Sequence, residues 1–372
     1  MAIKELSKNK YKLDIPIGYN GNKRIRHIET FYGTKKEATL RENEIKLQLK
    51  SNTYINKNNI TVTMFIEEWL KARKNNVAIK TYKNYEMYCK NISKYIGHIK
   101  LINVNAKILD TFYNELKTNT NYSGRTIKDH YTFITNLFNT AVNWNYLLVN
   151  PNLKTKPIKY TKTEIPCYSP EEVEQLLKVL KNEPIKYQAL IILTLDSGCR
   201  RGELTGLTWE DIDFEKSCIN INKTTQYVSG YGTFEKTTKT ASSNRIVYIS
   251  NVTLEILKKY RKEQLEKQLL LGNKWGNSKR VFTTDYGEAI HPNTPSKILD
   301  NIIKKYNLKK ISFHGLRHTS ISLLISSGTS IQIISKRAGH SNINITHNTY
   351  SHFFDNEFKE AANSIGTFLK VN

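Results

Sequence analysis

The hydrophobic pattern of this chain changes its period along the sequence, so one repeating architecture cannot account for all of it. Residues 11–17 alternate, with Tyr11, Leu13 and Ile15 on one face, which predicts a β-strand. Residues 127–142 repeat their apolar positions at helical spacing instead. The 372 residues are therefore predicted to form a multidomain protein whose parts differ in fold class.

The first part, residues 1–55, is predicted to be a small α+β module of two or three strands and one helix. The strand at 11–17 is followed by a turn and by a second apolar run at 24–31. Thr34 and Glu37 have capping-box spacing, which predicts a helix that reaches about Lys50.

This module is also basic. Residues 1–50 carry 12 Lys or Arg side chains against 6 Asp or Glu. A basic β-ribbon can enter a DNA groove, although a short basic sheet can equally be a solvated edge. On the first interpretation the candidate DNA contacts are Lys23, Arg24 and Arg26.

Residues 60–150 are predicted to form an all-α domain. An early segment repeats aromatic residues at Tyr82, Tyr85 and Tyr88, with lysines such as Lys83 between them. Aromatic stripes at helical spacing usually pack in a core, so the lysines are the better candidates for phosphate contacts.

Residues 151–164 are predicted to be an inter-domain linker, because they contain two prolines and little periodicity. This segment could also lie along DNA, through Lys154, Lys156 and Lys159. Ser169 is then predicted to cap a helix, with Pro170 in its first turn and Glu172 at capping-box spacing, and this helix begins the last domain. That domain, residues 165–372, is predicted to be mixed and mainly α, with a small sheet between about 217 and 249.

The net charge of +24 predicts a polyanionic partner, nucleic acid in preference to a membrane surface. The four cysteines lack CxxC spacing, which argues against a disulfide framework or a thiolate zinc cluster. No apolar run approaches the ~18 residues that span a bilayer, and the N-terminus lacks a signal-peptide core. We therefore expect a cytosolic protein that acts on double-stranded DNA.

The residues that carry chemistry gather in the last domain. They comprise an Arg-Arg pair at 200–201, a His-x-x-Arg-His run at 314–318, His340 and Tyr350. A tyrosine that attacks a phosphodiester conserves the bond energy in a covalent intermediate, so no energy cofactor is needed. Guanidinium groups can neutralise the charge of the transition state without a metal, and Arg200 and Arg317 are the candidates. We expect no cofactor and no metal site, because His314 and His318 lack a third ligand at sensible spacing.

The leaving 5′ hydroxyl needs a proton, and Lys239 is the candidate donor. Tyr350 must lose its own proton during attack, with His314 or His340 near enough to help or to bind the phosphate. The sequence does not decide which imidazole assists the tyrosine and which binds the phosphate.

The combination resembles the tyrosine recombinases, and within them the integrases of bacteriophages and conjugative transposons. Residues 195–204 resemble the first arginine box of that family, which selects Arg200 over Arg201. Residues 238–242 resemble its β-hairpin lysine motif, 314–319 its second box, 339–341 its third histidine and 349–352 its nucleophile motif. The catalytic set implied by the resemblance is Arg200, Lys239, His314, Arg317, His340 and Tyr350, and it omits His318 and Arg201.

The resemblance also implies the organisation of the whole chain: an arm-type DNA-binding domain, a SAM-like core-binding domain and a catalytic domain. It implies cleavage and rejoining of core sites through a 3′-phosphotyrosine and a Holliday junction, by a homotetramer in the bacterial cytoplasm at the nucleoid. Protomers would exchange C-terminal segments, here 353–372, whose apolar stripe could instead pack on its own domain. An excisionase and a host DNA-bending protein would be accessory partners.

Two other functions share some of these features. A type IB topoisomerase uses the same tyrosine chemistry as a monomer, and a DNA-binding regulator could carry an inactive site. The arm-like module speaks against the first and the complete catalytic set against the second. The residues do not reveal the attachment sequence, the type of mobile element or a bias toward integration or excision.

Overall fold

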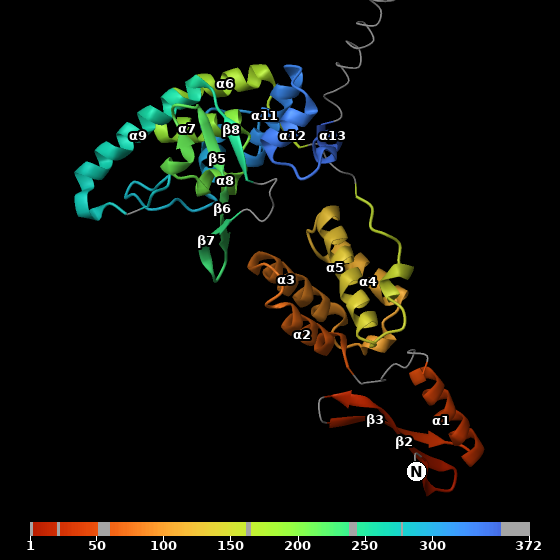
Figure 1. The fold of residues 1–372 in the computed structure, drawn as a ribbon. Helices are drawn as coiled ribbons and strands as arrows, with labels where there is room; N and C mark the ends of the chain where they lie inside the picture. The colour runs from red at the N-terminus through yellow and green to blue at the C-terminus, as the bar shows by residue number, and fades with distance from the viewer. Residues whose placement is uncertain are drawn as a thin grey trace, which may run out of the picture. The chain divides into compact units, whose positions relative to one another are not determined.

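The computed structural model describes residues 3–20, 23–50, 60–160, 165–237, 244–276 and 278–350. The chain divides into two compact units, residues 1–162 and 163–372. The first unit contains a small sheet with one helix, followed by a group of helices (Figure 1). The second unit combines helices with two small sheets.

The N-terminal module is an antiparallel sheet covered on one face by α1, as Figure 1 shows. Its strand order is β1-β2-β3, and the alternating side chains Tyr11, Leu13 and Ile15 are buried against the helix. The predicted capping box is confirmed, because the Thr34 backbone N–H donates to Glu37 Oε2 at 2.7 Å. The elements are β1 (Ile3–Ser7), β2 (Lys10–Asn20), β3 (Lys23–Tyr32) and α1 (Lys35–Lys50).

The helices that follow share one apolar core, to which the predicted aromatic stripe contributes. Tyr85 and Tyr88 pack against that core, and both rings contact Phe133. The all-α prediction is therefore confirmed for this part of the chain. Its helices are α2 (Val62–Arg73), α3 (Ile79–Ile96), η1 (Leu101–Asn103), α4 (Ala106–Asn119) and α5 (Gly124–Asn143).

The segment predicted as a linker begins with ordered structure. Residues Pro151–Lys154 form a 3-10 turn, η2, in which Asn152 is fully buried. Asn152 accepts a hydrogen bond from the Tyr113 hydroxyl at 2.7 Å and donates to Thr135 at 2.8 Å. The packing of the helical part thus extends past residue 150, because a buried amide side chain ties the turn to α4 and α5.

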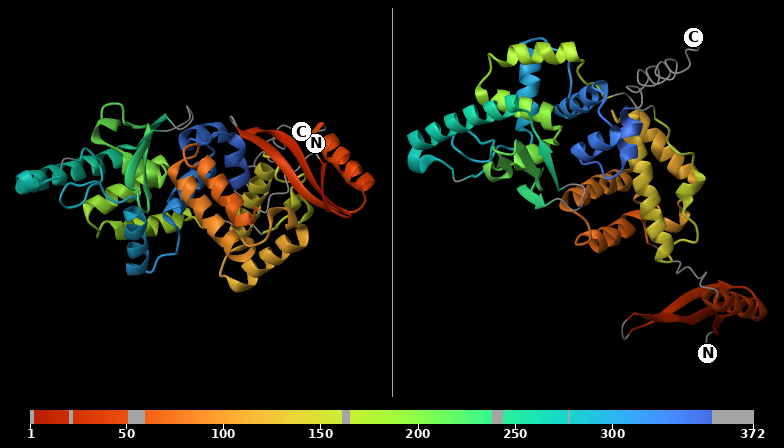
Figure 2. Two further views of the ribbon diagram at one scale, coloured as in Figure 1. Left: turned by 90° about the horizontal axis from the view of Figure 1, so that it is seen from below. Right: turned by 45° about the horizontal axis from the view of Figure 1, so that its top comes forward.

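The first helix of the second unit begins at the predicted start, where the Ser169 and Glu172 capping box is confirmed. Its long helix α9 and the pair α12 and α13 lie at opposite ends of the unit (Figures 1 and 2). The helices of this unit are α6 (Pro170–Leu180), α7 (Ile185–Ser197), α8 (Arg201–Gly206), η3 (Trp209–Asp211), α9 (Asn251–Leu271), η5 (Gly272–Lys274), α10 (Thr294–Lys305), α11 (Phe313–Ser326), α12 (Ile331–Ala338) and α13 (Ile343–Tyr350).

The described residues of the β-rich insert form two separate antiparallel sheets, of order β4-β5-β8 and β6-β7. In the first, Ile219 pairs with Val247, and both side chains are buried. The strands predicted around 219–222 and 245–249 are confirmed, and the turn predicted at 229–232 joins β6 to β7. The strands are β4 (Ile212–Asp213), β5 (Cys218–Ile221), β6 (Lys223–Val228), β7 (Gly232–Thr237) and β8 (Arg245–Tyr248).

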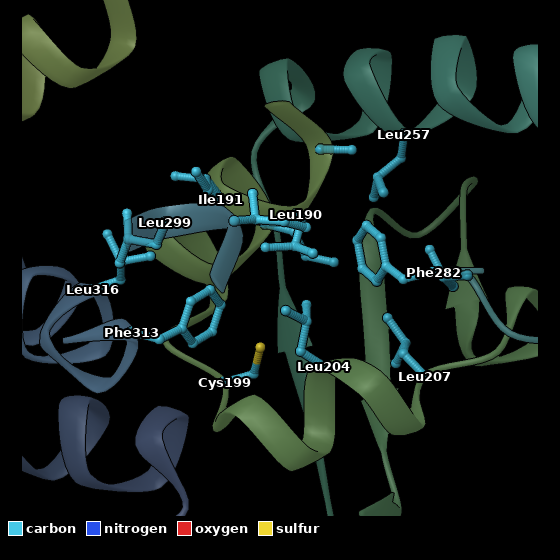
Figure 3. Close-up of a cluster of buried hydrophobic side chains, with 14 of the residues drawn as sticks. Leu190, Ile191, Cys199, Leu204, Leu207, Leu257, Phe282, Leu299, Phe313 and Leu316 are labelled. Atoms are coloured by element: carbon cyan, nitrogen blue, oxygen red, sulfur yellow. The ribbon is translucent and has the colours of Figure 1, made fainter. Parts of the chain in front are cut away.

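The core of this unit supports the residues that carry chemistry, because each has a buried neighbour in sequence. Figure 3 shows the side chains of Cys199, Phe313 and Leu316 directed into the apolar cluster. They precede Arg200, His314 and Arg317 in the chain. Core packing thus fixes the backbone from which each polar side chain projects.

Candidate active site

The first arginine lies where two helices meet. Helix α7 ends at Gly198, which has a left-handed φ of 62° and so favours glycine. Arg200 is the N-cap residue of α8. Its guanidinium donates to Glu203 Oε1 and to the carbonyl oxygen of Gly339, both at 2.9 Å. The sharp break between α7 and α8 therefore aims Arg200 across the unit at the turn after α12.

The second arginine projects from α11, one helical turn after His314. Arg317 donates to the carbonyl oxygens of Gly198 and Ala338, both at 2.7 Å. The two guanidinium groups thus bind successive carbonyls, those of Ala338 and Gly339. Arg317 ties together the end of α7, α11 and the end of α12.

The two guanidinium groups differ in exposure. The Arg200 side chain is 39% exposed, whereas Arg317 is 2% exposed. Burial lowers the pKa of Arg317 to about 10, and the charge of Arg200 contributes, so the Arg317 cation persists at neutral pH. Two of the five N–H donors of each guanidinium go to protein acceptors within the described residues, which leaves donors for an anionic ligand.

A buried carboxylate organises this region, and sequence reasoning missed it. Glu203 is 5% exposed and receives the Arg200 backbone N–H at 2.8 Å and Arg245 Nη2 at 2.9 Å. Burial alone would raise the pKa of Glu203, but the hydrogen bonds and charge of Arg245, with those of Arg200, hold it below its usual value. Glu203 has capping-box spacing from Arg200, and that local signal could have found it.

Arg245 begins β8 and joins the same network. Its Nε donates to the Arg337 carbonyl oxygen at 2.8 Å. A Cβ at Gly339 would lie 2.7 Å from the Arg245 guanidinium, and Gly339 has a left-handed φ of 67°. Position 339 therefore requires glycine on two independent grounds.

The two predicted imidazoles lie within range of the charges of both arginines. The pKa of both His314 and His340 is lowered by desolvation and then by the charges of Arg317 and Arg200, and that of His340 falls to about 4. His340 Nδ1 is hydrogen-bonded to the Thr346 hydroxyl at 2.7 Å. At neutral pH both imidazoles are therefore neutral, and a neutral imidazole can donate one hydrogen bond.

The predicted nucleophile is packed under this site. Tyr350, the last residue of α13, is 2% exposed and lies in an apolar cluster with Ile321, Ile325 and Ile334. Its hydroxyl is hydrogen-bonded to Nδ1 of His318. Burial raises the pKa of Tyr350, while Arg317 lowers it in part. The structure thus brings a histidine that the predicted catalytic set omits into contact with the phenol.

Five of the six predicted catalytic residues lie in the described part of the second unit: Arg200, His314, Arg317, His340 and Tyr350. Lys239 lies outside the described residues, as does the C-terminal segment 353–372. Charge interactions of both arginines reach His314 and His340. These four groups therefore share one local electrostatic environment, with Tyr350 coupled to Arg317.

The candidate DNA contacts lie on the surface. Arg24 and Arg26 are exposed on β3, and Arg26 pairs with Asp14 at 2.6 Å. Lys83 on α3 pairs with Glu86 at 2.7 Å. The side chain of Lys23 lies outside the description, and the exposed lysines of the former linker are Lys154, Lys156 and Lys159.

Neither a metal cluster nor a membrane-spanning helix is found in the described part of the chain. No three His, Cys, Asp or Glu side chains there are placed to hold a metal ion. No helix there is both long and apolar enough to cross a bilayer.

Comparison with family models gives two matches. A model described as the phage integrase family matches residues 168–357. A model of the N-terminal SAM-like domain of phage integrases matches residues 61–117. The first covers the unit that contains the arginines and Tyr350.

Similar proteins were found along nearly the full length of the chain. A tyrosine recombinase XerC-like protein of Caldanaerobacter subterraneus is 30% identical, over 97% of this chain and 96% of the relative. The ICEBs1 integrase of Bacillus subtilis is 25% identical, over 99% and 100%. The integrase of Staphylococcus phage L54a is 29% identical, over 84% and 94%.

Solved structures share the fold at lower identity. The Tn1549 transposon integrase in complex with a circular intermediate DNA superposes with a TM-score of 0.71 at 20% identity, covering 82% of this chain and 99% of that one. A lambda integrase dimer bound to a COC′ core site gives a TM-score of 0.61 at 16% identity, covering 96% and 95%. These similarities confirm the predicted architecture of a helical SAM-like domain and a mainly helical domain with small sheets.

Proposed function

The chain belongs to the phage integrase family of tyrosine recombinases, and from that premise we propose which of its residues carry out recombination. Like the family in general, it is a site-specific recombinase that cleaves and rejoins DNA through a tyrosine nucleophile and a Holliday junction. We infer that Tyr350 is the nucleophile and that Arg200 and Arg317 bind the scissile phosphate. His314, His340 and Lys239 complete the set.

The arginine geometry supports the phosphate role. Attack on the phosphodiester builds negative charge on the non-bridging oxygens, and donors that are already oriented stabilise it most. Both guanidinium groups are held by backbone carbonyls or a buried carboxylate. The side chains therefore need little reorganisation when DNA binds, and their remaining N–H groups bind the phosphate oxygens.

The imidazoles act as neutral donors in this proposal. Burial, and then the charges of Arg317 and Arg200, lower the pKa of His314 and of His340, so a third and a fourth positive charge beside the arginines would be unfavourable. A neutral imidazole still donates one hydrogen bond to a phosphate oxygen. The Thr346 hydroxyl supports this assignment by fixing the ring of His340 through Nδ1.

Lys239 supplies the proton to the leaving 5′ oxygen. Nearby positive charge lowers the pKa of an ammonium group, and a lowered pKa suits a general acid. This assignment rests on the lysine motif of the family and on the sequence position of Lys239 between β7 and β8.

The single observation that carries the proposal is the gathering of Arg200, Arg317 and Tyr350 from distant parts of the sequence into one region of the second unit. The test is an adduct assay on a nicked suicide duplex that carries the core site. The sequence of that site is determined from the junctions between the integrated element and its host DNA. Wild-type protein should form a covalent adduct that survives denaturation, and Tyr350→Phe should form none. An adduct in Tyr350→Phe, or none in wild type, would refute the nucleophile assignment.

We further propose that residues 1–55 bind arm-type DNA sites, 60–150 the core site and 165–372 the scissile phosphate. The open face of the N-terminal sheet supports this, since it presents Arg24 and Arg26 together with Lys12. Deletion of residues 1–55 should abolish the arm-site footprint and preserve core-site cleavage. An unchanged footprint would refute the arm assignment.

Recombination by the family requires four active sites, so we propose a homotetramer on paired DNA sites. A groove of about 1040 Å³ lies between β8 and α12, with Ile246, Tyr248 and Ile333 exposed along it. We assign this groove as the acceptor for segment 353–372 of a neighbouring protomer. Ile333→Asp and deletion of 353–372 should both abolish Holliday-junction formation while single-site DNA binding persists.

An excisionase and a host DNA-bending protein fit the two-site architecture as accessory partners, because an arm and a core site on one duplex can be bridged only when the DNA between them bends. We propose that the protein acts at the bacterial nucleoid, where its DNA substrate would lie. Circularisation assays with purified protein, with and without host extract, test the need for such factors.

A further inference from the structure

His318 lies at the buried end of the active site and touches the reacting atom. It follows Arg317 on α11 and is 6% exposed. Its Nδ1 is hydrogen-bonded to the Tyr350 hydroxyl, and the two ring centroids are 5.4 Å apart. No water layer separates the imidazole from the phenol, so a proton can pass directly between them.

The nucleophile needs such an acceptor. A tyrosine attacks efficiently as the phenolate, and its reference pKa is near 10. Tyr350 is 2% exposed, and burial raises its pKa further, although Arg317 partly offsets the rise. At neutral pH the phenol therefore keeps its proton until a base removes it during attack.

The other imidazoles are engaged differently. His340 directs its Nδ1 to Thr346 at 2.7 Å. His314 packs edge-on against His318, with ring centroids 4.7 Å apart. Both adjoin the arginines that bind the phosphate, whereas His318 faces the phenol.

We propose that His318 is the general base that accepts the Tyr350 proton during DNA cleavage, which makes it a further catalytic residue. The proton passes from Tyr350 Oη to His318 Nδ1 as Oη bonds to phosphorus. The bond from phosphorus to the 5′ oxygen breaks, and that oxygen takes a proton from Lys239. Religation reverses each transfer. The reaction requires the neutral tautomer with its proton on Nε2, and the inference rests on Tyr350 being the nucleophile.

The first test compares variants on the nicked core-site duplex under single-turnover conditions. His318→Asn keeps an oxygen that can accept a hydrogen bond but cannot take the proton. It should lower the rate of adduct formation about 10²–10⁴-fold and leave DNA affinity within about twofold. His347→Asn is the matched control, because this exposed histidine lies on α13 one turn before Tyr350, and it should keep the wild-type rate. If His318→Asn fails to bind DNA, His318→Phe refills the ring volume and carries the same test.

The pH profile separates a base from a positioning residue. The groups that face this pair are His314 and Arg317 on α11 and Cys167 before α6. On a duplex whose bridging 5′ oxygen is replaced by sulfur, the leaving group needs no proton from Lys239, so wild-type cleavage should rise with pH to a plateau as His318 loses its proton. In His318→Asn the plateau should disappear and the rate should keep rising with hydroxide. If His318→Asn keeps a plateau, whatever its absolute rate, the proposal is wrong.

A sulfur substitution distinguishes the two proton transfers. When sulfur replaces the bridging 5′ oxygen of the DNA, the leaving thiolate needs no proton. Lys239→Ala should then recover most of its rate, and His318→Asn should not. The inference is wrong if sulfur restores the rate of His318→Asn. It is also wrong if His318→Asn cleaves the ordinary duplex at a rate within about threefold of wild type, or faster than wild type. If Tyr350→Phe remains inactive in the same assay, such a result leaves the proposed function standing.

Discussion

The two halves of the active site are built in different ways. The arginine half consists of Arg200 and Arg317, held by two backbone carbonyls of the turn after α12, by Gly198 and by Glu203. The tyrosine half consists of Tyr350 on the eight-residue helix α13, in a small apolar cluster and bonded to His318. Charge stabilisation is thus built into the centre of the unit, and the nucleophile is delivered by a short peripheral helix.

The difference teaches which half can move. A guanidinium with several fixed partners loses each of them when it shifts, so the arginine half should behave as one rigid body. Tyr350 packs in a small apolar cluster and is hydrogen-bonded to His318. We therefore expect substitutions in the arginine half to change catalysis or global stability, and substitutions in the tyrosine half to change the local position of the nucleophile.

The largest expected effect comes from Arg317→Lys. A lysine cannot reach the carbonyls of Gly198 and Ala338 and also bind a phosphate, because its ammonium is a single point donor. Adduct formation should fall about 10²–10³-fold with nearly unchanged core-site affinity, as measured by single-turnover cleavage and gel shift. An equal loss of affinity and rate would contradict a role in the transition state and weaken the comparison.

Glu203→Gln should rank next. Removing the charge leaves Arg245 buried beside a neutral amide, and breaking a buried ion pair of this kind costs about 3–5 kcal/mol. The free energy of unfolding of the 163–372 unit, followed by urea denaturation, should fall by that order. Glu255→Gln, an exposed partner of Lys258 on α9, is the matched control and should cost under about 1 kcal/mol.

The pH dependence of stability sharpens the comparison further. The pKa of His340 is lowered to about 4 from 6.5, so the unfolded chain takes up a proton that the folded chain refuses. Stability should therefore be full above about pH 6.5 and fall as the pH drops toward 4. His340→Asn should reduce the dependence of unfolding free energy on pH, as measured by urea titrations at several pH values. A part of that dependence should remain, because the pKa of His314 is lowered too. An identical slope in the variant would show that His340 does not contribute.

The smallest expected effect on stability and cleavage rate comes from substituting Thr346, which joins the two halves of the site. Thr346 on α13 is fully buried and holds Nδ1 of His340. Thr346→Val should cost about 1 kcal/mol of stability and lower the cleavage rate only severalfold, whereas Thr346→Ser should restore both. A loss as large as that of Arg317→Lys would mean that the halves are one rigid unit.

Local signals made much of this molecule predictable. The capping boxes at Thr34 and Ser169 depend on residues three positions apart, and the helix and strand periods follow from burial on one face. Arg200, Arg317 and Tyr350 could be named because their motifs are contiguous. The partnership of Glu203 with Arg245 was out of reach, because the two residues are 42 positions apart and the pairing depends on how β8 packs.

The role of His318 was hidden for the same reason. On the sequence, His318 is one of two histidines around Arg317, and nothing local distinguishes it. Only the return of α13 against α11 brings the Tyr350 hydroxyl to its Nδ1. Asn152 is a similar case, since its burial in η2 depends on Tyr113 from a distant helix.

The acceptors that hold Arg200 and Arg317 include the carbonyl oxygens of Gly198, Ala338 and Gly339. Every amino acid carries a main-chain carbonyl, so no single codon change can delete these acceptors. Substitution at Ala338 therefore alters the surroundings of Arg317 but leaves this acceptor in place. The other two acceptors belong to Gly198 and Gly339, whose left-handed backbone favours glycine. Holding the guanidinium groups thus depends on main-chain conformation at two glycines and not on the chemistry of any side chain there.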